Sequence, residues 1–245
     1  MPQNNQVFTV IASVIVLAFG IGFAGQKIHD GLVDFRSFDR SVTMKGLAQQ
    51  DVKADLALWP ISYTETGNEL SSLQDLMDSR GKTVISFLKK HGIKDEEIEL
   101  KKVQVQDLLA QSYRQSGAAQ NRYILTQTYL VRTNDINSID KAAKNMGELI
   151  RLGVVFSQNG STSPTYLYTR LNEIKPEMIA RATRNAREAA KEFAQNSGQK
   201  VGGIKYASQG VFQILPRDQS FAVAEAQQRN KTVRVVSTIQ FYLED

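Results

Sequence analysis

The chain has 245 residues, of which 42% are hydrophobic and 22% charged, so it is large enough to bury a core as one large domain or two small ones. It contains no cysteine, which excludes disulfides, thiolate catalysis and cysteine metal sites, and its two histidines, His29 and His91, are too far apart in sequence to indicate a metal site. The net charge of +5 is spread over the chain beyond residue 40. We interpret it as a solvated basic surface and expect no nucleic-acid partner.

The chain begins with a polar tail, residues 1–6, followed by an apolar run over residues 7–25. As a helix, residues 7–24 would span roughly 27 Å, close to the thickness of a bilayer core. Gly20, Gly22 and Gly25 have the spacing of a dinucleotide fingerprint, but they lie inside and at the end of the apolar run instead of between a strand and a helix. The sequence therefore predicts a transmembrane anchor at residues 7–25.

A cleaved signal peptide is the alternative for the same segment. Gly22-Phe23-Ala24 is an acceptable cleavage site before Gly25, but residues 1–6 contain no Lys or Arg and the apolar run is long for a signal core. We favour a retained single-pass anchor, with cleavage near Ala24 as the alternative. The cationic residues nearest to the span follow it, which by itself mildly favours a cytoplasmic body.

Residues 26–41 are interpreted as a connector and residues 42–245 as the folded body. From Val42 the pattern predicts a strand, a bend at Gly46 and a second strand in "DVKADLALWPISY". Pro60 has no N–H to donate to a neighbouring strand and therefore indicates a sheet edge or a bulge. Trp59 is interpreted as a core or interface anchor.

The next segments repeat this pattern of a strand followed by a helix. Leucine-rich helical spacing from Leu70 ends at His91-Gly92, and a strand over Ile98–Val105 shifts its apolar phase by one between Leu100 and Val103, which indicates a β-bulge. Residues 107–121 are predicted to be a loop or hairpin tip. The next strand is "RYILTQTYLVRTND", and Asn134 or Asp135 is expected to cap a helix that ends at Gly153. That helix has a predicted apolar stripe of Ile136, Ile139, Ala143, Met146 and Ile150.

Two related strand–helix–strand halves are therefore expected, one from Asp51 and one from Arg122. After them come two strands around an Asn159-Gly160 turn, then a long helix opened by Pro176, and further strands near Ile204–Ile214 and Thr232–Leu243. The long helix has a predicted buried stripe of Ala182, Ala186, Ala189 and Phe193. Its other side has basic residues interleaved with glutamates, namely Arg181, Arg184, Arg187, Lys191, Glu177, Glu188 and Glu192. The fold class is α+β, with the long C-terminal helix packed on antiparallel sheet.

No catalytic motif emerges from the chain. It lacks a Gly-x-Ser-x-Gly elbow, a Walker loop and a His-Glu-x-x-His pair. We predict no catalytic residue, no cofactor-binding residue and no metal ligand, and therefore no enzyme. A small-ligand or lipid-binding module is the alternative, for which Trp59, Tyr63, Tyr166 and Tyr168 would have to line one cavity.

The segments "VTMKGLAQQDVKADLALWPISY", "RYILTQTYLVR", "GELIRLGV" and "YLYTRLNEIKPEMIARATRNAREAAKEFAQNSGQKVGGI" resemble the SIMPL-domain family over about residues 41–243. The resemblance implies an α+β fold, a location in the bacterial envelope, assembly into homo-oligomeric rings in some members and no established catalytic residues. Members often have proline before the strand aspartate, where this chain has Ala54 before Asp55. This difference concerns the local edge geometry.

Members of this family are usually exported, so we place the body in the periplasm on a single-pass inner-membrane anchor. The alternative is a soluble periplasmic protein. We expect a non-enzymatic protein that self-assembles and acts through contacts with envelope proteins in envelope or oxidative stress tolerance.

Overall fold

The computed structural model describes residues 17–18, 20–28, 40–110, 121–157, 163–218 and 224–244. Of the predicted anchor at 7–25, only residues 17, 18 and 20–25 fall within this description, and they are helical. No helix among the described residues combines the length and the hydropathy that a membrane crossing requires. The predicted turn at Asn159-Gly160, the loop tip near Ser116 and most of the connector lie outside the described residues.

The chain divides into two compact units, which are described separately. The first consists of residues 1–48, 177–211 and 235–245, and the second of residues 49–176 and 212–234. Both of the predicted strand–helix–strand halves fall in the second unit. Three elements contribute residues to both units: β1 (Ser41–Lys53), α5 (Leu171–Asn196) and β8 (Asn230–Glu244).

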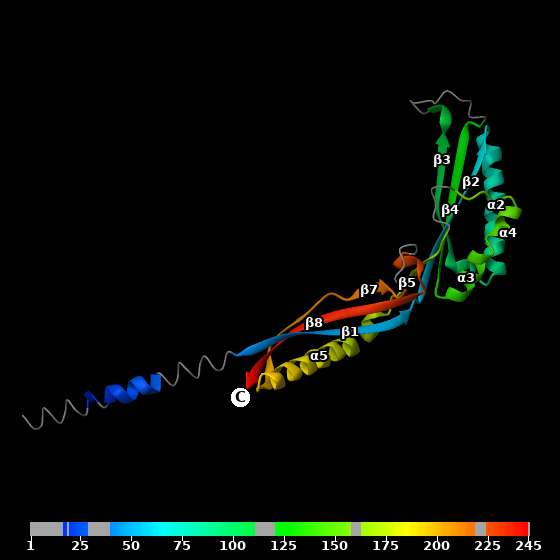
Figure 1. The fold of residues 1–245 in the computed structure, drawn as a ribbon. Coiled ribbons are helices and arrows are strands. Elements are labelled where there is room, and N and C mark those ends of the chain that lie inside the picture. The colour runs from blue at the N-terminus through cyan, green and yellow to red at the C-terminus, as the bar shows by residue number, and fades with distance from the viewer. Residues whose placement is uncertain are drawn as a thin grey trace, which may run out of the picture. The chain divides into compact units, whose positions relative to one another are not determined.

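The second unit contains a four-stranded antiparallel sheet in the order β3-β4-β2-β5 (Figure 1). Its strands are β2 (Leu56–Gly67), β3 (Ile98–Asp107), β4 (Tyr123–Thr133) and β5 (Thr165–Leu167). Helix α2 (Leu70–Lys90) connects β2 to β3, and α3 (Ile136–Lys144) with α4 (Gly147–Arg151) connects β4 to β5. This βαββαβ order, with each half contributing one inner and one outer strand, is the ferredoxin-like arrangement.

Helix α2 is the best-defined prediction of the sequence. The side chain of Glu69 accepts hydrogen bonds from the backbone N–H groups of Ser71 and Ser72, which caps the N-terminus, and the helix ends at His91 before Gly92 with φ of 91°. The inward-facing residues are Leu73, Met77, Gly81, Val84, Phe87 and Leu88. They pack on the alternating inner residues of β2 and β4, which include Trp59, Ile61, Tyr63, Leu125 and Val131.

The strand predictions around β2 needed correction at two points. Residues 51–63 do not form one strand, because the chain breaks at Ala54–Asp55 between β1 and β2. The segments on either side of the predicted 159–160 turn pair with β2 and not with each other: β5 pairs with Leu56–Leu58, and Phe156 bridges to Tyr63.

Pro60 lies between these two contacts and opposite Leu130 of β4. The N–H of Thr64 donates to the carbonyl of Val155, on the side of β2 that faces away from β4. Because the backbone N–H groups of a strand point alternately to its two sides, the nitrogen of Pro60 points to this same side, where no N–H is required.

The second helical connection is shorter than predicted. Asp135 caps α3 through the N–H groups of Asn137 and Ser138, but the helix stops at Lys144 and a separate turn, α4, follows. This interruption changes the phase of the buried face. Ile150, predicted to be buried, is 61% exposed, and Leu149 is buried in its place. The predicted bulge in β3 is confirmed by a register shift between Leu100 and Lys102.

In the first unit, α5 packs on the sheet through a stripe of small residues at strict four-residue spacing. The buried residues of α5 are Met178, Ala182, Ala186, Ala190 and Ala194. The predicted stripe was therefore partly wrong, since Phe193 is 50% exposed. Pro176 was also wrongly predicted to open the helix, which begins at Leu171. The strands here are the N-terminal part of β1, the C-terminal part of β8 and β6 (Lys200–Gln209), in the order β1-β8-β6, with β7 (Gln213–Pro216) a separate strand in the second unit.

Gly46 is part of a continuous β1 and not a bend, and its lack of a side chain allows α5 to approach. A Cβ atom at this position would lie 1.8 Å from the carbonyl oxygen of Ala182 and 2.7 Å from the backbone nitrogen of Ala186. Because both atoms belong to the helix backbone, they cannot move aside as a flexible side chain could.

We therefore expect Gly46→Ala to lower the free energy of unfolding by about 2 kcal/mol or more through overpacking. Urea denaturation of the full chain in mild detergent measures this, with Gly203→Ala as the matched control, because a Cβ at Gly203 of β6 meets no atom within 4 Å. Equal midpoints for the two variants would contradict the close approach.

Candidate functional site

The break between β1 and β2 organises the polar residues of the second unit. At this break the N–H of Ala54 donates to the carbonyl of Arg229 at 2.8 Å and the N–H of Asp55 donates to the carbonyl of Leu167 at 3.0 Å. The side-chain amide of Asn134 donates to the carbonyl of Asp55 at 2.6 Å. We call residues 54–55 the junction. A proline in place of Ala54 has no N–H and could not donate the first of these bonds. The alanine by which this chain differs from the proline pattern therefore supplies a hydrogen bond to Arg229.

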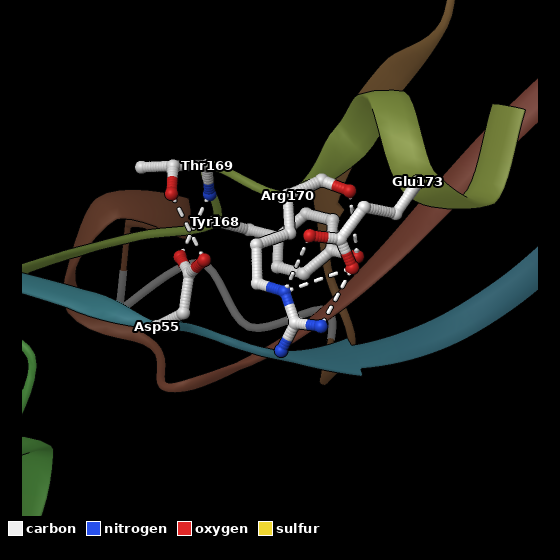
Figure 2. Close-up of polar contacts among 5 residues, drawn as sticks. All are labelled: Asp55, Tyr168, Thr169, Arg170 and Glu173. Carbon is white, nitrogen blue, oxygen red and sulfur yellow. Dashed lines mark hydrogen bonds and ion pairs between the residues drawn. The ribbon is translucent and has the colours of Figure 1, made fainter.

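The Asp55 carboxylate extends the junction to the segment that leads into α5 (Figure 2). One oxygen accepts from the backbone N–H of Thr169 at 2.7 Å and the other from its hydroxyl at 2.9 Å. Next to it, Arg170 donates to both carboxylate oxygens of Glu173, and the Tyr168 hydroxyl donates to the carbonyl of Arg170 at 3.3 Å. The hydrogen bonds from Arg170 hold the pKa of Glu173 below its usual range. These contacts fix the course of the chain from the end of β5 into α5.

The junction thereby positions Tyr166 and Arg229, which meet at the carboxylate of Asp140 on α3. The Tyr166 hydroxyl donates to one oxygen of Asp140 and the Arg229 guanidinium to the other, and Arg229 also donates to the side-chain oxygen of Asn137 at 3.0 Å. The side chain of Asp140 is only 17% exposed. Burial, followed by the hydrogen bond to Asp140, raises the pKa of Tyr166, so this hydroxyl remains a donor at neutral pH.

A pocket of about 680 Å³ opens beside this group and is the candidate small-molecule site of the second unit. Its walls come from three segments, and its lining consists of Asp140, Ala143, Lys144, Ser163, Pro164, Tyr166, Asp218, Gln227, Gln228, Arg229 and Asn230. The Lys144 ammonium forms no hydrogen bond or ion pair with the described residues. Asp218, in contrast, is paired with Arg217 at 3.1 Å.

The four aromatic residues that the sequence singled out do not line one cavity. Trp59 and Tyr63 are completely buried, and together with Tyr166 they belong to the hydrophobic core beneath α2, whereas Tyr168 lies outside that core. The condition set for the alternative function, an aromatic cavity that binds a small ligand or lipid, is therefore not met. Only Tyr166 borders the pocket. Its acidic and basic neighbours, Asp140 and Arg229, were not singled out, because they are 89 residues apart in sequence and no local motif connects them.

An exposed apolar surface forms a second candidate site, at the edge of the sheet of the second unit. The inner side chains of β3 continue the row of buried residues on β4, with Val103 opposite Gln127 and Val105 opposite Leu125. Helix α2 covers β2 and β4, but Leu100, Val103 and Val105 are 49%, 46% and 48% exposed. Sheet residues of this type are normally covered, so this surface, defined by Leu100, Val103 and Val105, is a candidate contact site.

Within the described residues, no three histidine, aspartate or glutamate side chains gather in a way that would hold a metal ion. A comparison with family models matches the SIMPL family, described as a protein of unknown function (DUF541), over residues 42–241. The chain therefore belongs to the SIMPL family. No curated protein matches it.

The Asp140 group yields a stability prediction. We expect Asp140→Asn to lower the free energy of unfolding by about 1–3 kcal/mol, because the substitution weakens two hydrogen bonds and leaves Arg229 without its counter-charge. Asp218→Asn is the control, since the side chain of Asp218 is 69% exposed and its pair with Arg217 contributes little. Urea denaturation of both variants provides the comparison, and an equal loss in the two would show that Asp140 does not hold these segments together.

Proposed function

We propose that this SIMPL-family protein is a non-enzymatic, membrane-anchored protein that assembles with copies of itself and acts through protein contacts in the periplasm. The observation that carries the assembly is the exposed inner face of β3, where Leu100, Val103 and Val105 are each nearly half exposed on a sheet that is covered elsewhere. The apolar run at residues 7–25 supports the anchor. The family resemblance supports the periplasmic location and a role in envelope or oxidative stress tolerance.

The absence of enzymatic activity in this proposal is supported by the pairing of the acids in the pocket. Asp140 accepts hydrogen bonds from Tyr166 and Arg229, and Asp218 is paired with Arg217. Both carboxylates are therefore engaged with side chains of the protein itself.

The molar mass of the full chain in mild detergent tests the assembly. We expect a multiple of the 27.3 kDa chain for the unaltered protein and a self-dissociation constant at least about tenfold weaker for Val105→Asp, because the interface would then bury an unpaired charge. Val211→Asp is the control, since Val211 is 85% exposed outside this surface. An unaltered protein with the mass of a single chain would overturn the proposed assembly.

The pocket favours a second candidate function, the binding of a small organic anion. Lys144 and Arg229 line the same pocket, and the guanidinium of Arg229 has N–H groups beyond the two that donate to Asp140 and Asn137. Two cationic donors around one pocket match a carboxylate or phosphate group.

Isothermal titration of the full chain with citrate and with inorganic phosphate tests this second function. We expect binding of at least one anion and an affinity about tenfold weaker for Lys144→Gln, the equivalent of about 1.4 kcal/mol. Lys141→Gln is the control on the same helix, because Lys141 does not line the pocket. No heat from either anion would reject the anion-binding function.

A further inference from the structure

Three strands and the helix of the first unit come together at one end of its sheet. The N–H of Leu243 on β8 donates to the carbonyl of Arg40, directly before β1, at 3.0 Å, and Val201 of β6 pairs with the same Leu243. Helix α5 ends at Asn196, four residues before β6 begins. Because the chain enters β1 here, we call this end the entry end, and it consists of residues 40–42, 191–206 and 241–244.

Large apolar and aromatic side chains are exposed at the entry end. They are Phe193, Ile204, Tyr206 and Tyr242, and their exposed fractions lie between 38% and 60%. The rest of this sheet is covered in the ordinary way, since Phe241 and Ile239 are buried against Ala186 and Ala190 of α5. The exposed side chains are therefore confined to one end of the unit, where they mark a contact surface.

These side chains lie on both faces of β6. Ile204 pairs with Phe241, which is buried beneath α5, whereas Tyr206 pairs with Gln240 after a shift of register and points to the opposite face. On that opposite face the ammonium of Lys205 lies 5.6 Å from the ring centroid of Tyr242. Since β6 is the last strand in the order β1-β8-β6, both faces border the same edge and can reach one extended surface.

The entry end also has an excess of positive charge. Its cationic residues are Arg40, Lys191, Lys200 and Lys205, and its acidic residues are Glu192 and Glu244. Tyrosine rings and lysines of this kind are typical of protein surfaces at a bilayer, where the rings lie at the level of the headgroups and the ammonium groups approach anionic phosphates. The composition of the entry end thus matches an anionic lipid surface.

The sequence keeps the entry end close to the predicted anchor. The apolar run ends at residue 25, and fifteen residues, 26–40, separate it from β1. Fifteen residues span at most roughly 50 Å when fully extended, so the entry end stays within this distance of the point where an anchored chain leaves the bilayer. A surface tethered in this way meets the bilayer at high effective concentration, and weak individual contacts are then sufficient for docking.

We propose that the entry end of the first unit docks on the anionic headgroups of the bilayer that holds the anchor. Tyr206 and Tyr242 lie among the headgroups, and Lys205 contacts their phosphates. This inference rests on the membrane anchor proposed above and adds a second contact with the same membrane, one that fixes which end of the first unit faces it.

The test uses the absence of cysteine from the chain, so that a single introduced thiol carries the only label. Gly203→Cys places an environment-sensitive fluorophore in the entry end, where a Cβ meets no atom within 4 Å. Val211→Cys is the matched control, because Val211 is 85% exposed in the same unit and follows the opposite end of β6. The full chain is reconstituted in vesicles of phosphatidylcholine and phosphatidylglycerol that contain lipids with a spin-labelled headgroup.

We expect the spin labels to quench the fluorophore at residue 203 and not the one at residue 211, and we expect less quenching in vesicles of phosphatidylcholine alone. Lys205→Glu, made together with Gly203→Cys, changes two units of charge and is expected to make docking roughly tenfold weaker. Lys82→Glu on α2 is its control, because it changes the net charge equally outside the first unit.

Flotation of the same vesicles after a wash in about 1 M salt reports the anchor separately, because such salt screens surface charge and does not extract an apolar span. A chain that floats but is quenched no more at residue 203 than at residue 211 overturns the docking and leaves the anchor intact. Quenching that does not depend on phosphatidylglycerol, or that Lys205→Glu changes no more than Lys82→Glu, overturns the assignment to anionic lipid. A chain that does not float overturns both the anchor and the docking.

Discussion

The two-residue junction at Ala54–Asp55 is the constraint on which the second unit depends. Its backbone and the Asp55 side chain connect β1 and β2 to three segments far away in sequence, at Asn134, at Leu167–Thr169 and at Arg229. Each of these long-range contacts satisfies a backbone or side-chain polar group at the point where the strand pairing changes. They hold in place the segments from which Tyr166 and Arg229 reach Asp140, and these three residues line the pocket.

The residues that the sequence identified correctly are those whose reasons are local. The helical spacing from Leu70 and the glycine after His91 delimit α2, the phase slip between Leu100 and Val103 indicates the bulge, and Asp135 caps α3. Each of these signals lies within a few residues of the feature that it predicts. The strand predicted near Thr232–Leu243 is likewise confirmed by β8.

The errors arise where a distant segment decides the local structure. Gly46 has the sequence character of a bend but lies within a strand, because α5 packs against its backbone. Ile150 matches the helical phase that begins at Ile136, but the interruption after Lys144 rotates Leu149 into the core. The Asp140 group escaped prediction because its members come from three segments, and no spacing in the sequence relates them.

The edge strand β3 combines two features that discourage pairing with another strand. A bulge and adjacent lysines are devices by which proteins protect sheet edges, and β3 has both at Lys101–Lys102. A strand that paired with this edge would have to accommodate the extra residue of the bulge and the charges of the two lysines. The residues Leu100, Val103 and Val105 therefore offer a partner their exposed side chains more readily than β3 offers its edge.

The opposite edge of this sheet is also poorly suited to pairing with another strand. The strand β5 pairs with only Leu56–Leu58, and Pro60 follows with no N–H to donate. The proposed self-assembly therefore depends on side-chain contacts such as those of Leu100, Val103 and Val105. If such contacts are to close a ring, they must be of the head-to-tail kind, because a two-fold contact that uses the same surface on both copies is complete once two copies have met.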